Sequence, residues 1–472
     1  MEKHEIERAI TLAGLPIPDS DIDITGADPV FYGPFHLGEG AAVTQALIGS
    51  KIDQIWQEQG HTAQTINIDV RHAAASLTSA QFVSVPEMPE RDTLGENLRR
   101  IYKCADGRYF QLHSNFGETH ELAAELGVST YASVEEIAQV MSERNSFELE
   151  ALLVDKNLTG GVVRTTEEWA AHEQGKILAT KPVVEIIKIG DSPPEPVSSG
   201  ARPLSDLRVL DLTRVLAGPT CARSLAEHGA QVLHVASPHL PTVEVFEMDT
   251  GHGKRQIHID LNDPDQVDVL RDLAKTSDVF NQGFRKGALD RRGFGPSDMA
   301  SLRPGIIYVS ENCYGHEGPW ATRPGYEQYS QIISGLADLQ GKLAPIEPNA
   351  DTRIALGNDP QAPRLVGAAV NDYTTAYFAT YGVLEALRRR AVEGGSWHVQ
   401  VSLTQTSMWF QNLGLIEGVG PETKLGDVTD FLETHDTPYG EMRHLAPSLH
   451  MSETEPYWAF GSRPLGSDSP EW

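Results

Sequence analysis

Cysteine is scarce in this sequence, which has three among 472 residues, Cys104, Cys221 and Cys313. They lie too far apart for a zinc ribbon or a CxxC redox pair, and so few cysteines fit a reducing compartment. We predict no bound metal ion. Basic residues are also few: 38 Lys and Arg stand against 66 Asp and Glu, for a formal net charge of −28. A field of this sign repels phosphate and argues against nucleic acid or an anionic membrane as a partner.

Long apolar runs are missing as well. No stretch approaches roughly 18 uninterrupted apolar residues, so no transmembrane helix is expected. The first residues, MEKHEIERAI, lack the basic and then apolar order of a secretory signal. Hydrophobic residues make up 40% of the chain and charged residues 22%, which is an ordinary globular balance. We therefore expect a soluble, cytoplasmic protein without a membrane partner.

The usual phosphate-binding loops are absent. The segment GHGKRQ (251–256) contains Gly-Lys but lacks the GxxxxGK[ST] spacing of a Walker loop. No GxGxxG follows the strand expected at 207–213, where LTRVLAGP stands instead. A nicotinamide-dependent oxidoreductase is therefore disfavoured.

The clearest interruption of the chain is IGDSPPEPVSSGARPLSD (189–206), whose prolines cannot continue a helix or a central strand. Before it, Ser133 and Glu136 predict a capping box, and Asp106-Gly107 predicts a β-turn. The predicted parts are an N-terminal helical segment with a small mixed α+β domain (1–190), a linker (191–206), a Rossmann-like domain (207–425) and a C-terminal extension (426–472).

Downstream of the linker, short apolar strands alternate with helices. The expected strands are 207–213, 230–236, 278–283 and 305–311, with helices at 217–229 and 265–277 between them. This alternation predicts the α/β class, with an open parallel sheet and right-handed crossovers. Open sheets bind ligands beyond the carboxyl ends of their strands. We therefore expect the chemistry in the loops that follow Thr213, Ala236, Gly283 and Glu311.

Two distant segments, 39–77 and 366–407, resemble each other. Each has GAAV near its start, continues as a helix of about five turns, and then shows an alternating strand and another helix. Duplication explains this similarity, and a chance likeness between two amphipathic segments is the alternative.

Basic residues gather in one segment despite the acidic balance. NQGFRKGALDRRGFG (281–295) holds four cations and one acid, a local charge of +3. A polyphosphate ligand needs such a patch, because guanidinium and ammonium groups form charge-assisted bonds to phosphate oxygens. A set of solvated helix-end cations is the alternative. The basic residues of this segment and of the loop after the second strand are Arg285, Lys286, Arg291, Arg292, Lys254 and Arg255.

Two carboxylates stand in unusual contexts. Glu327 follows a Pro-Gly turn, and Asp372 is expected at the start of a helix. On spacing alone, Asp372 fits a helix N-cap and Glu327 fits a first-turn acid favoured by the helix dipole. A catalytic role for both is the second interpretation.

Five segments together resemble the class III (CaiB/BaiF-type) coenzyme A transferases, the family that includes carnitine CoA-transferase, formyl-CoA transferase and α-methylacyl-CoA racemase. The resemblance covers about residues 207–410, and the LAGP and GALDR–GFG patterns are its most specific parts. In order, the segments are LRVLDLTRVLAGPTCARSLAEHGAQVLHV, GHGKRQIHIDL, DVFNQGFRKGALDRRGFG, IIYVSENCYGHEGPWATRPGYEQYSQIISG and PRLVGAAVNDYTTAYFATYGVLEAL.

The resemblance implies roles for particular residues. The family nucleophile is an Asp ten residues before the glycine of a GVLEAL-like segment, which places it at Asp372. Tyr326-Glu327 resembles the pair found in transferases, whereas racemases have His-Asp there, and this difference puts racemisation in doubt. The residues that correspond to CoA contacts are Arg214, Val215, Leu216, Ala217, Lys254, Arg255 and Arg291.

The implied activity is transfer of CoA from an acyl-CoA to a carboxylic acid through an aspartyl mixed anhydride and an aspartyl-CoA thioester. The substrates would be small molecules, with a homodimer as the expected assembly. Backbone donors for the oxyanion are expected in a loop such as 315–318. A racemase or isomerase acting at the α-carbon, and a non-catalytic CoA-binding relic, are the alternatives. The second is suggested by residues 85–185, which resemble the family's small domain but precede the sheet.

Overall fold

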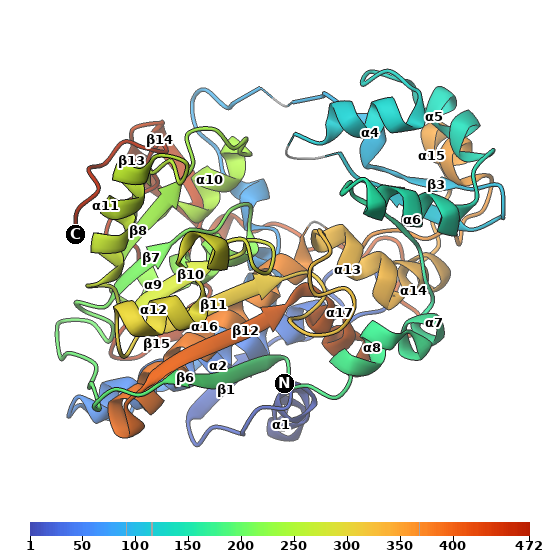
Figure 1. The fold of residues 1–472 in the computed structure, drawn as a ribbon. Helices are drawn as coiled ribbons and strands as arrows, with labels where there is room; N and C mark the ends of the chain where they lie inside the picture. Colours follow the sequence, from blue (N-terminus) through green and yellow to red (C-terminus); the bar gives the residue numbers. More distant parts are fainter. Residues whose placement is uncertain (91, 115–116, 368) are drawn as a thin grey trace.

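A computed structural model describes residues 1–90, 92–114, 117–367 and 369–472. Its largest feature is a seven-stranded sheet (Figure 1). In spatial order the strands are β9 (Lys254–His258), β8 (Gln231–Ala236), β7 (Arg208–Asp211), β10 (Val279–Gln282), β11 (Ile307–Asn312), β12 (Ser396–Ser402) and β6 (Val184–Gly190). All neighbours are parallel except β6, which runs antiparallel to β12. The predicted α/β class with an open, mainly parallel sheet is confirmed.

The direction of winding reverses between β7 and β10. The chain passes from β7 outward to β8 and β9, then returns to β10 and winds the other way to β11 and β12. This is the order of a doubly wound nucleotide-binding sheet, where a crevice opens at the reversal, beyond the carboxyl ends of the strands. The edge strand β6 was not expected. It comes from the part of the chain that precedes the linker, and residues 191–206 after it contain no helix or strand.

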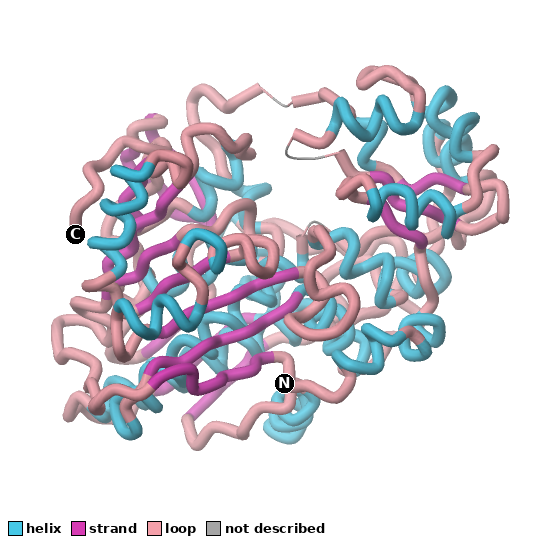
Figure 2. Tube along the Cα trace, in the orientation of Figure 1, coloured by secondary structure: helices cyan, strands magenta, loops and turns pink. Residues whose placement is uncertain are grey.

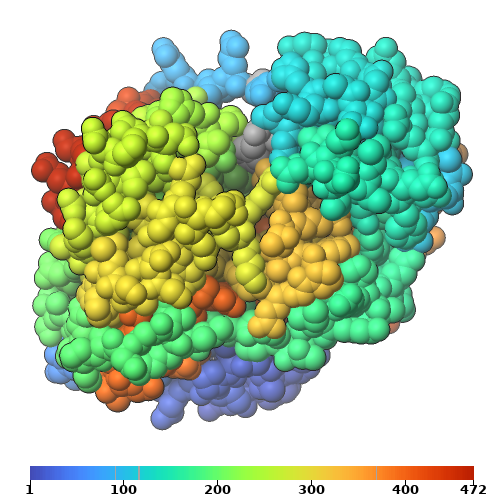
Figure 3. Space-filling model, viewed as in Figure 1, coloured from blue at the N-terminus to red at the C-terminus, as the bar shows by residue number. Residues whose placement is uncertain are grey.

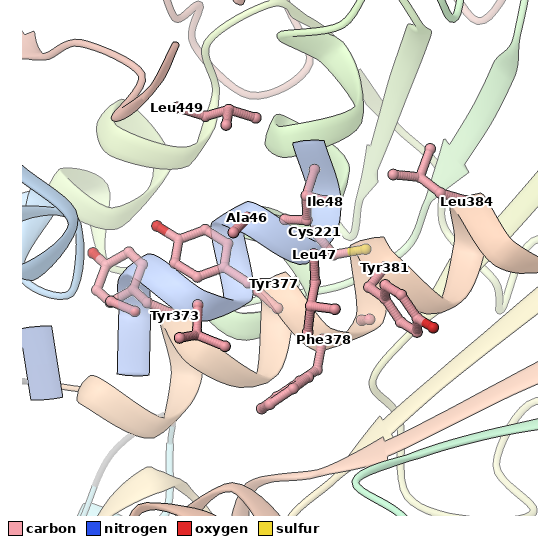
Figure 4. Packing of buried hydrophobic residues seen from close by; sticks show 14 of the residues in the cluster. Ala46, Leu47, Ile48, Cys221, Tyr373, Tyr377, Phe378, Tyr381, Leu384 and Leu449 are labelled. Atoms are coloured by element: carbon pink, nitrogen blue, oxygen red, sulfur yellow. The ribbon is translucent and has the colours of Figure 1, made fainter. Parts of the chain in front are cut away.

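Helices cover both faces of the sheet. Helices α11 (Pro264–Ala274) and α12 (Pro296–Leu302) pack their apolar sides on one face. On the other face lie α9 (Ala217–Ala226) and α16 (Val370–Glu393), and α2 (Leu37–Glu58) packs against α16. Figure 4 shows this second layer, where Tyr377 and Phe378 of α16 lie beside Ala46, Leu47 and Ile48 of α2.

Helix α16 crosses the sheet at very short range. A Cβ atom at Gly382 would lie 2.4 Å from Val399 Cγ1 on β12 and 2.8 Å from Val184 Cγ1 on β6. Those separations are far inside van der Waals contact, so a glycine is required at this crossing. The close approach fixes the position of the helix, and with it the residues of its first turn.

The N-terminal strands β1 (Asp21–Thr25) and β2 (Thr65–Asp69) form a separate three-stranded sheet with β15 (Leu449–Met451), which comes from the C-terminal part of the chain. The two similar segments of the sequence have the same order of elements. In the first, α2 is followed by β2 and α3 (Val70–Ser76); in the second, α16 is followed by β12 and α17 (Leu403–Asn412). The two long helices pack against each other, but the two strands belong to different sheets.

A small unit of helices and strands forms around a separate three-stranded antiparallel sheet (Figure 2). Ser133 and Glu136 form the predicted capping box, and the predicted turn at Asp106-Gly107 connects two of its strands. Helix α15 (Ala350–Leu356) joins this unit from far along the chain. The elements are β3 (Ile101–Lys103), β4 (Tyr109–Leu112), β5 (Gly160–Val162), α4 (Thr119–Leu126), α5 (Val134–Met141) and α6 (Ser146–Asp155).

Shorter elements complete the chain. Among the described residues, no helix combines the length and the apolar character needed to cross a bilayer. The remaining helices and strands are α1 (Lys3–Leu12), α7 (Thr166–Ala171), α8 (Glu173–Leu178), α10 (Glu244–Thr250), α13 (Glu327–Ser334), α14 (Leu336–Leu343), β13 (Leu432–Thr437) and β14 (Gly440–Leu445). Four 3-10 turns are η1 (Ser79–Phe82), η2 (Glu96–Arg99), η3 (Asp290–Arg292) and η4 (Thr429–Phe431).

Candidate active site

A cavity of about 400 Å³ opens where the winding of the sheet reverses. Its walls include residues of the loops after β7 and β10, the end of β11, the segment 321–328, and His113 and Glu118 of the small unit. Figure 3 shows the surface hollowed between the sheet residues and the small unit. The loops predicted to follow Thr213, Gly283 and Glu311 therefore meet at one site, whereas the loop after Ala236 does not line it.

Asp372 and Glu327 both line this cavity. Asp372 lies in the first turn of α16, and Glu327 is the first residue of α13. The Oε1 atom of Glu327 accepts hydrogen bonds from Gln331 Nε2 (2.7 Å) and from the backbone amide of Asn371 (3.2 Å). Because Asn371 adjoins Asp372, the second bond holds the two helix N-termini together and brings the two carboxylates to one place.

The simpler interpretations of these two residues can now be judged. The N-cap of α16 is Ala369, so Asp372 is not a capping residue. Glu327 is a first-turn acid, as the simpler interpretation stated. Its Oε1 atom, however, accepts a hydrogen bond from the backbone amide of Asn371 on another helix, α16. Ala369 has a φ of 35°, a left-handed conformation that non-glycine residues seldom adopt. This strain lies three residues before Asp372 and beside the cavity.

Asp372 and Glu327 are buried at the cavity, and Glu311 is half-buried there. Burial raises the pKa of Asp372 well above its usual range, and the neighbouring charges of Glu327 and Glu311 raise it further. Burial also raises the pKa of Glu327 to about 7 and that of Glu311 to about 7. The site therefore retains protons near neutral pH, and the three groups compete to be the one that ionises.

Glu311 was missed from the sequence. It ends the buried part of β11, and its carboxylate accepts a hydrogen bond from the amide of Gly218, in the first turn of α9. A carboxylate at a helix N-terminus is favoured by the orphan amides and the dipole of the helix. The signal that could have identified it was its place at the carboxyl end of a strand next to the reversal of winding.

The loop between β7 and α9 is held in a strained conformation. Val215 has a φ of 74°, which is unfavourable for a β-branched residue. A Cβ at Gly218 would lie 2.2 Å from Thr213 Cγ2, so the glycine of LAGP is required for the tight turn. Asn281 Nδ2 on β10 donates to the carbonyl of Gly218 (2.9 Å). These contacts hold the loop against the neighbouring strand and fix the wall of the cavity.

Comparison with known proteins is decisive at this point. The sequence profile of CoA-transferase family III matches residues 204–440. The chain is 32% identical over 466 residues to the acetyl-coenzyme A transferase nodX of Hypoxylon pulicicidum, an alignment that covers 88% of this chain and 75% of that protein. The chain belongs to CoA-transferase family III.

A second curated relative agrees with this membership. The chain is 30% identical over 429 residues to an acyl-CoA transferase of Gibberella moniliformis, covering 82% of this chain and 73% of the relative. A solved CaiB/BaiF family protein from Brucella suis is 23% identical, with 51% of this chain and 65% of that chain covered and a TM-score of 0.38. As a family III member, the protein is an enzyme that transfers CoA.

The family III resemblance predicted seven CoA contacts, and the structure brings four of them to the cavity. The four are the consecutive residues Arg214, Val215, Leu216 and Ala217. Arg255 on β9 and Arg291 in η3 do not line the cavity. Two cations that the resemblance did not select, Arg285 and Lys286, do line it. They come from the basic segment identified in the sequence.

Lys254 is also away from the cavity. Its side chain is buried, with 1% of the residue exposed. The ammonium group donates to Asp211 Oδ2 (2.9 Å) and to the carbonyl of Pro219 (2.6 Å). Lys254 therefore neutralises a buried acid beneath the β7–α9 loop instead of presenting its charge to a ligand.

The predicted oxyanion loop lies elsewhere. The amide of Gly315 donates to Asn312 Oδ1 (2.7 Å), and Gly318 packs against Gln174 and Ile177 of α8. Neither glycine lines the cavity. In the first turn of α9, Ala217 lines the cavity, and its backbone amide is the remaining candidate donor, because the Gly218 amide donates to Glu311 and Pro219 has no N–H.

Two other groups at the cavity are chemically inactive near neutral pH. Burial raises the pKa of the Cys313 thiol well above its usual range, so it stays protonated and is a poor nucleophile. His113 stacks on Tyr326 with ring centroids 4.6 Å apart, and burial lowers its pKa to about 3. An imidazole this weakly basic is poorly suited to removing an α-proton, which further disfavours a racemase.

The raised pKa of Glu327 predicts a pH-dependent effect on stability. An acid whose folded pKa exceeds its unfolded value destabilises the fold as pH rises from about 4.5 through 7, because the unfolded chain ionises first. Glu327→Gln should therefore unfold at the same denaturant concentration as wild type near pH 4, but gain up to about 3 kcal/mol at pH 8. Urea unfolding at both pH values measures this. Equal stability at pH 8 would contradict a buried carboxyl with a raised pKa.

Proposed function

We propose that this protein moves CoA from an acyl-CoA thioester to a free carboxylic acid, with Asp372 as the covalent carrier. The observation that carries the proposal is the position of Asp372, which lies beside Glu327 and Glu311 in a cavity at the reversal of a doubly wound sheet. A carboxylate is a weak nucleophile in water, and desolvation together with fixed orientation makes it effective. The family III membership supports CoA as the group that is moved.

The first half of the proposed cycle forms an enzyme-bound thioester. An oxygen of ionised Asp372 attacks the thioester carbonyl of the donor, the C–S bond breaks, and CoA leaves as a thiolate. The acyl group and Asp372 then form a mixed anhydride. The thiolate attacks the Asp372 carbonyl carbon, the anhydride C–O bond breaks, and the donor acid leaves as its carboxylate. Asp372 is now joined to CoA as a thioester.

The second half repeats these steps in reverse with the acceptor. The acceptor carboxylate attacks the aspartyl thioester, releases the thiolate and forms a new anhydride. The thiolate attacks the acceptor carbonyl, which yields the new acyl-CoA and restores the Asp372 carboxylate. Each step of this cycle forms one bond and breaks another, and no oxidant or reductant is consumed.

The residues around Asp372 have distinct proposed tasks. Glu327, by accepting from the Asn371 amide, orients the first turn of α16 and acts as a positioning residue. Glu311 and Glu327, with pKa values of about 7, hold the proton that Asp372 must give up before it can attack. The amide of Ala217 at the start of α9 would face the developing oxyanion, where preorganised donors have the largest effect on rate. Arg214 and Lys286 offer positive charge to the phosphates of CoA.

The basic segment provides a test of how CoA binds. Lys286→Ala should raise the KM for acyl-CoA about tenfold with little change in kcat, because a lost charge-assisted contact weakens binding and does not alter the reacting atoms. Arg291→Ala is the matched control, since Arg291 is exposed in the same segment but does not line the cavity. Steady-state kinetics of both variants measure the effect. If Arg291→Ala raised KM and Lys286→Ala did not, the CoA phosphates would lie beyond η3.

The proposed activity is tested by a screen of CoA esters against free acids, with product CoA esters measured by mass. We expect a new CoA ester to form only when both a thioester and an acceptor acid are present. Incubation of a single 2-methyl acyl-CoA in deuterated water is the companion experiment. Deuterium uptake at the α-carbon without CoA exchange would identify an isomerase, and CoA binding with neither product would identify a non-catalytic binder.

A further inference from the structure

Three histidines from distant parts of the chain converge outside the cavity. His252 lies in the turn between α10 and β9, His435 is on β13, and His444 is on β14. One ring nitrogen from each lies within 4.8 Å of the other two. Nδ1 of His435 is 2.8 Å from Nε2 of His444. None of the three lines the CoA cavity, so they belong to a separate place in the fold.

His252 has an unusual environment for an imidazole. The residue is 1% exposed, and among the described residues neither of its ring nitrogens has a hydrogen-bond partner. A buried polar group without a partner costs about 1–3 kcal/mol, so such groups in proteins call for an explanation. The ring of His252 packs against those of His444 and Trp458, with centroids 3.9 and 5.0 Å away. Its two ring nitrogens are therefore available to a bound ligand.

The hairpin β13–β14 places a fourth donor beside the histidines. Residues 433 and 435 share one face of β13, and Glu433 is paired with His444 across the hairpin. Glu433 Oε1 is buried without a hydrogen-bond partner among the described residues and lies 3.9 Å from His444 Nε2. Three potential ligands thus come from one face of the hairpin, and His252 comes from the turn between α10 and β9.

One of the rings is already oriented for coordination. Nδ1 of His444 lies 3.0 Å from the carbonyl of Leu445. When Nδ1–H donates to that carbonyl, Nε2 carries the lone pair, which accepts from His435 Nδ1 at 2.8 Å and would turn to the ion once His435 loses that proton. Metal-bound histidines are characteristically held by a hydrogen bond of this kind from the second nitrogen.

We propose that His252, His435 and His444 form a binding site for a divalent transition-metal ion of the Zn²⁺ type, with Glu433 completing a tetrahedron. Imidazole nitrogens suit Zn²⁺, Cu²⁺ and Ni²⁺, and three His with one carboxylate is a common four-coordinate set. Zn–N bonds of about 2.0–2.1 Å place neighbouring ligand nitrogens about 3.3 Å apart. The His435–His444 pair, at 2.8 Å, must open by about 0.5 Å to reach that separation, and the His252 nitrogen lies within 4.8 Å of both.

The surrounding charges allow a cation at this place. The positive charge of Arg223 lowers the pKa of both His252 and His444, but its guanidinium is paired with Asp249 at 2.8 Å. Lys254 is likewise paired with Asp211. The carboxylate of Glu433 supplies an uncompensated negative charge next to the rings. The chain as a whole carries a net charge of −28, which attracts cations to its surface.

The ion would link segments that are far apart in the sequence. The hairpin β13–β14 follows the doubly wound sheet in sequence. The backbone of Arg443 on β14 forms an isolated antiparallel β-bridge with that of Ser84, just before the small unit. On the other side, His252 follows α10, and Phe246 of that helix lines the CoA cavity. The metal therefore has a structural role: it fastens the C-terminal hairpin to the helix that forms one wall of the cavity. The sequence predicted no metal, and this inference departs from that expectation.

The test uses untagged full-length protein stripped with EDTA and titrated with Zn²⁺ alone. We expect one equivalent to bind by calorimetry and to raise the melting temperature, and Co²⁺ to give the visible absorption of a tetrahedral site. His252→Gln and His435→Gln should each weaken binding roughly 100-fold or more. Because His435 is less buried than His252, its variant keeps the test decisive if His252→Gln fails to fold.

A second cluster in the chain provides the control. Asp28, His36 and Glu39 also converge, but Glu39 accepts from His36 Nδ1 at 2.6 Å, and Asp28 accepts from the backbone amide of Glu39 at 2.8 Å. His36→Gln should therefore leave Zn²⁺ binding unchanged. The proposal is overturned if the wild type binds no stoichiometric Zn²⁺ and melts at the same temperature with and without it. It is also overturned if His36→Gln abolishes binding and the other two variants retain it.

Discussion

Asp372→Asn should reduce the rate of CoA transfer by about a thousandfold or more, to the background of the uncatalysed exchange. Asparagine preserves the size and shape of the side chain, but its amide cannot form the anhydride or the thioester on which the proposed cycle depends. Initial rates with the best donor and acceptor from the screen measure the loss. Binding of CoA by calorimetry should persist, since Asp372 is proposed to react with the acyl carbon and not to hold the nucleotide.

Stability separates this loss from misfolding. Burial and two neighbouring carboxyls raise the pKa of Asp372, so the neutral asparagine should leave the fold at pH 8 as stable as wild type or more so. Glu311→Gln is the matched control, because it also removes a carboxyl from the same cavity. That variant should turn over more slowly yet still form the covalent adduct. If Asp372→Asn retained a tenth of the wild-type rate, Asp372 would not be the carrier.

Lys254→Met should destabilise the protein by about 3–5 kcal/mol, because it leaves the carboxylate of Asp211 buried without its counter-ion. Both side chains are essentially inaccessible, with exposed fractions of 1% and 0%. Urea unfolding measures the loss. The double variant Lys254→Met with Asp211→Asn should recover much of it, since the pair as a whole contributes far less than either half left alone.

The same variant decides between two roles for Lys254. A lysine that contacts CoA would show a raised KM for acyl-CoA and nearly normal stability when replaced. The buried ion pair predicts the opposite: low stability, with the KM of the folded fraction close to that of wild type. A stable Lys254→Met protein with a tenfold higher KM would restore the contact that the family resemblance implied.

Lys254 illustrates the limit of local pattern. GHGKRQ contains the Gly-Lys pair found in phosphate-binding loops. Nothing in the local sequence indicates that its lysine begins a strand and that its side chain faces the interior. Its partner Asp211 is 43 residues away and belongs to another strand. Only the register between the strands β7, β8 and β9 makes the two meet. The sequence can predict each strand, but not which polar residue points beneath which loop.

Much of the fold was accessible because its signals are local. Apolar strands, the spacing of helices, the capping box at Ser133 and the turn at Asp106-Gly107 depend on neighbouring residues. Strand β6 was missed because VEIIKIG runs directly into the proline-rich segment and lacks a regular polar–apolar alternation, with Ile186 and Ile187 adjacent. Its antiparallel pairing with β12 is a contact across about two hundred residues of chain.

The candidate site likewise combines features that local sequence predicts with features that arise only from long-range contacts. Asp372 and Glu327 were predicted through motifs, but the bond from the Asn371 amide that joins their helices is purely tertiary. Glu311, Arg285 and Lys286 enter the cavity because the strands that precede them end at the reversal of winding. The cluster of His252, His435 and His444 has no recognisable spacing at all, since its members meet only when the C-terminal hairpin folds back onto α10.

The central claim is that the carboxyl of residue 372 becomes covalently joined to CoA during turnover. It is tested most directly by incubating the protein with an acyl-CoA and no acceptor, quenching with hydroxylamine, and mapping the modified peptides by mass spectrometry. The account predicts a hydroxamate at Asp372, dependent on acyl-CoA and absent from Asp372→Asn. A protein that turns over CoA esters while no carboxyl is modified, or while the modification lies on another residue, would contradict it.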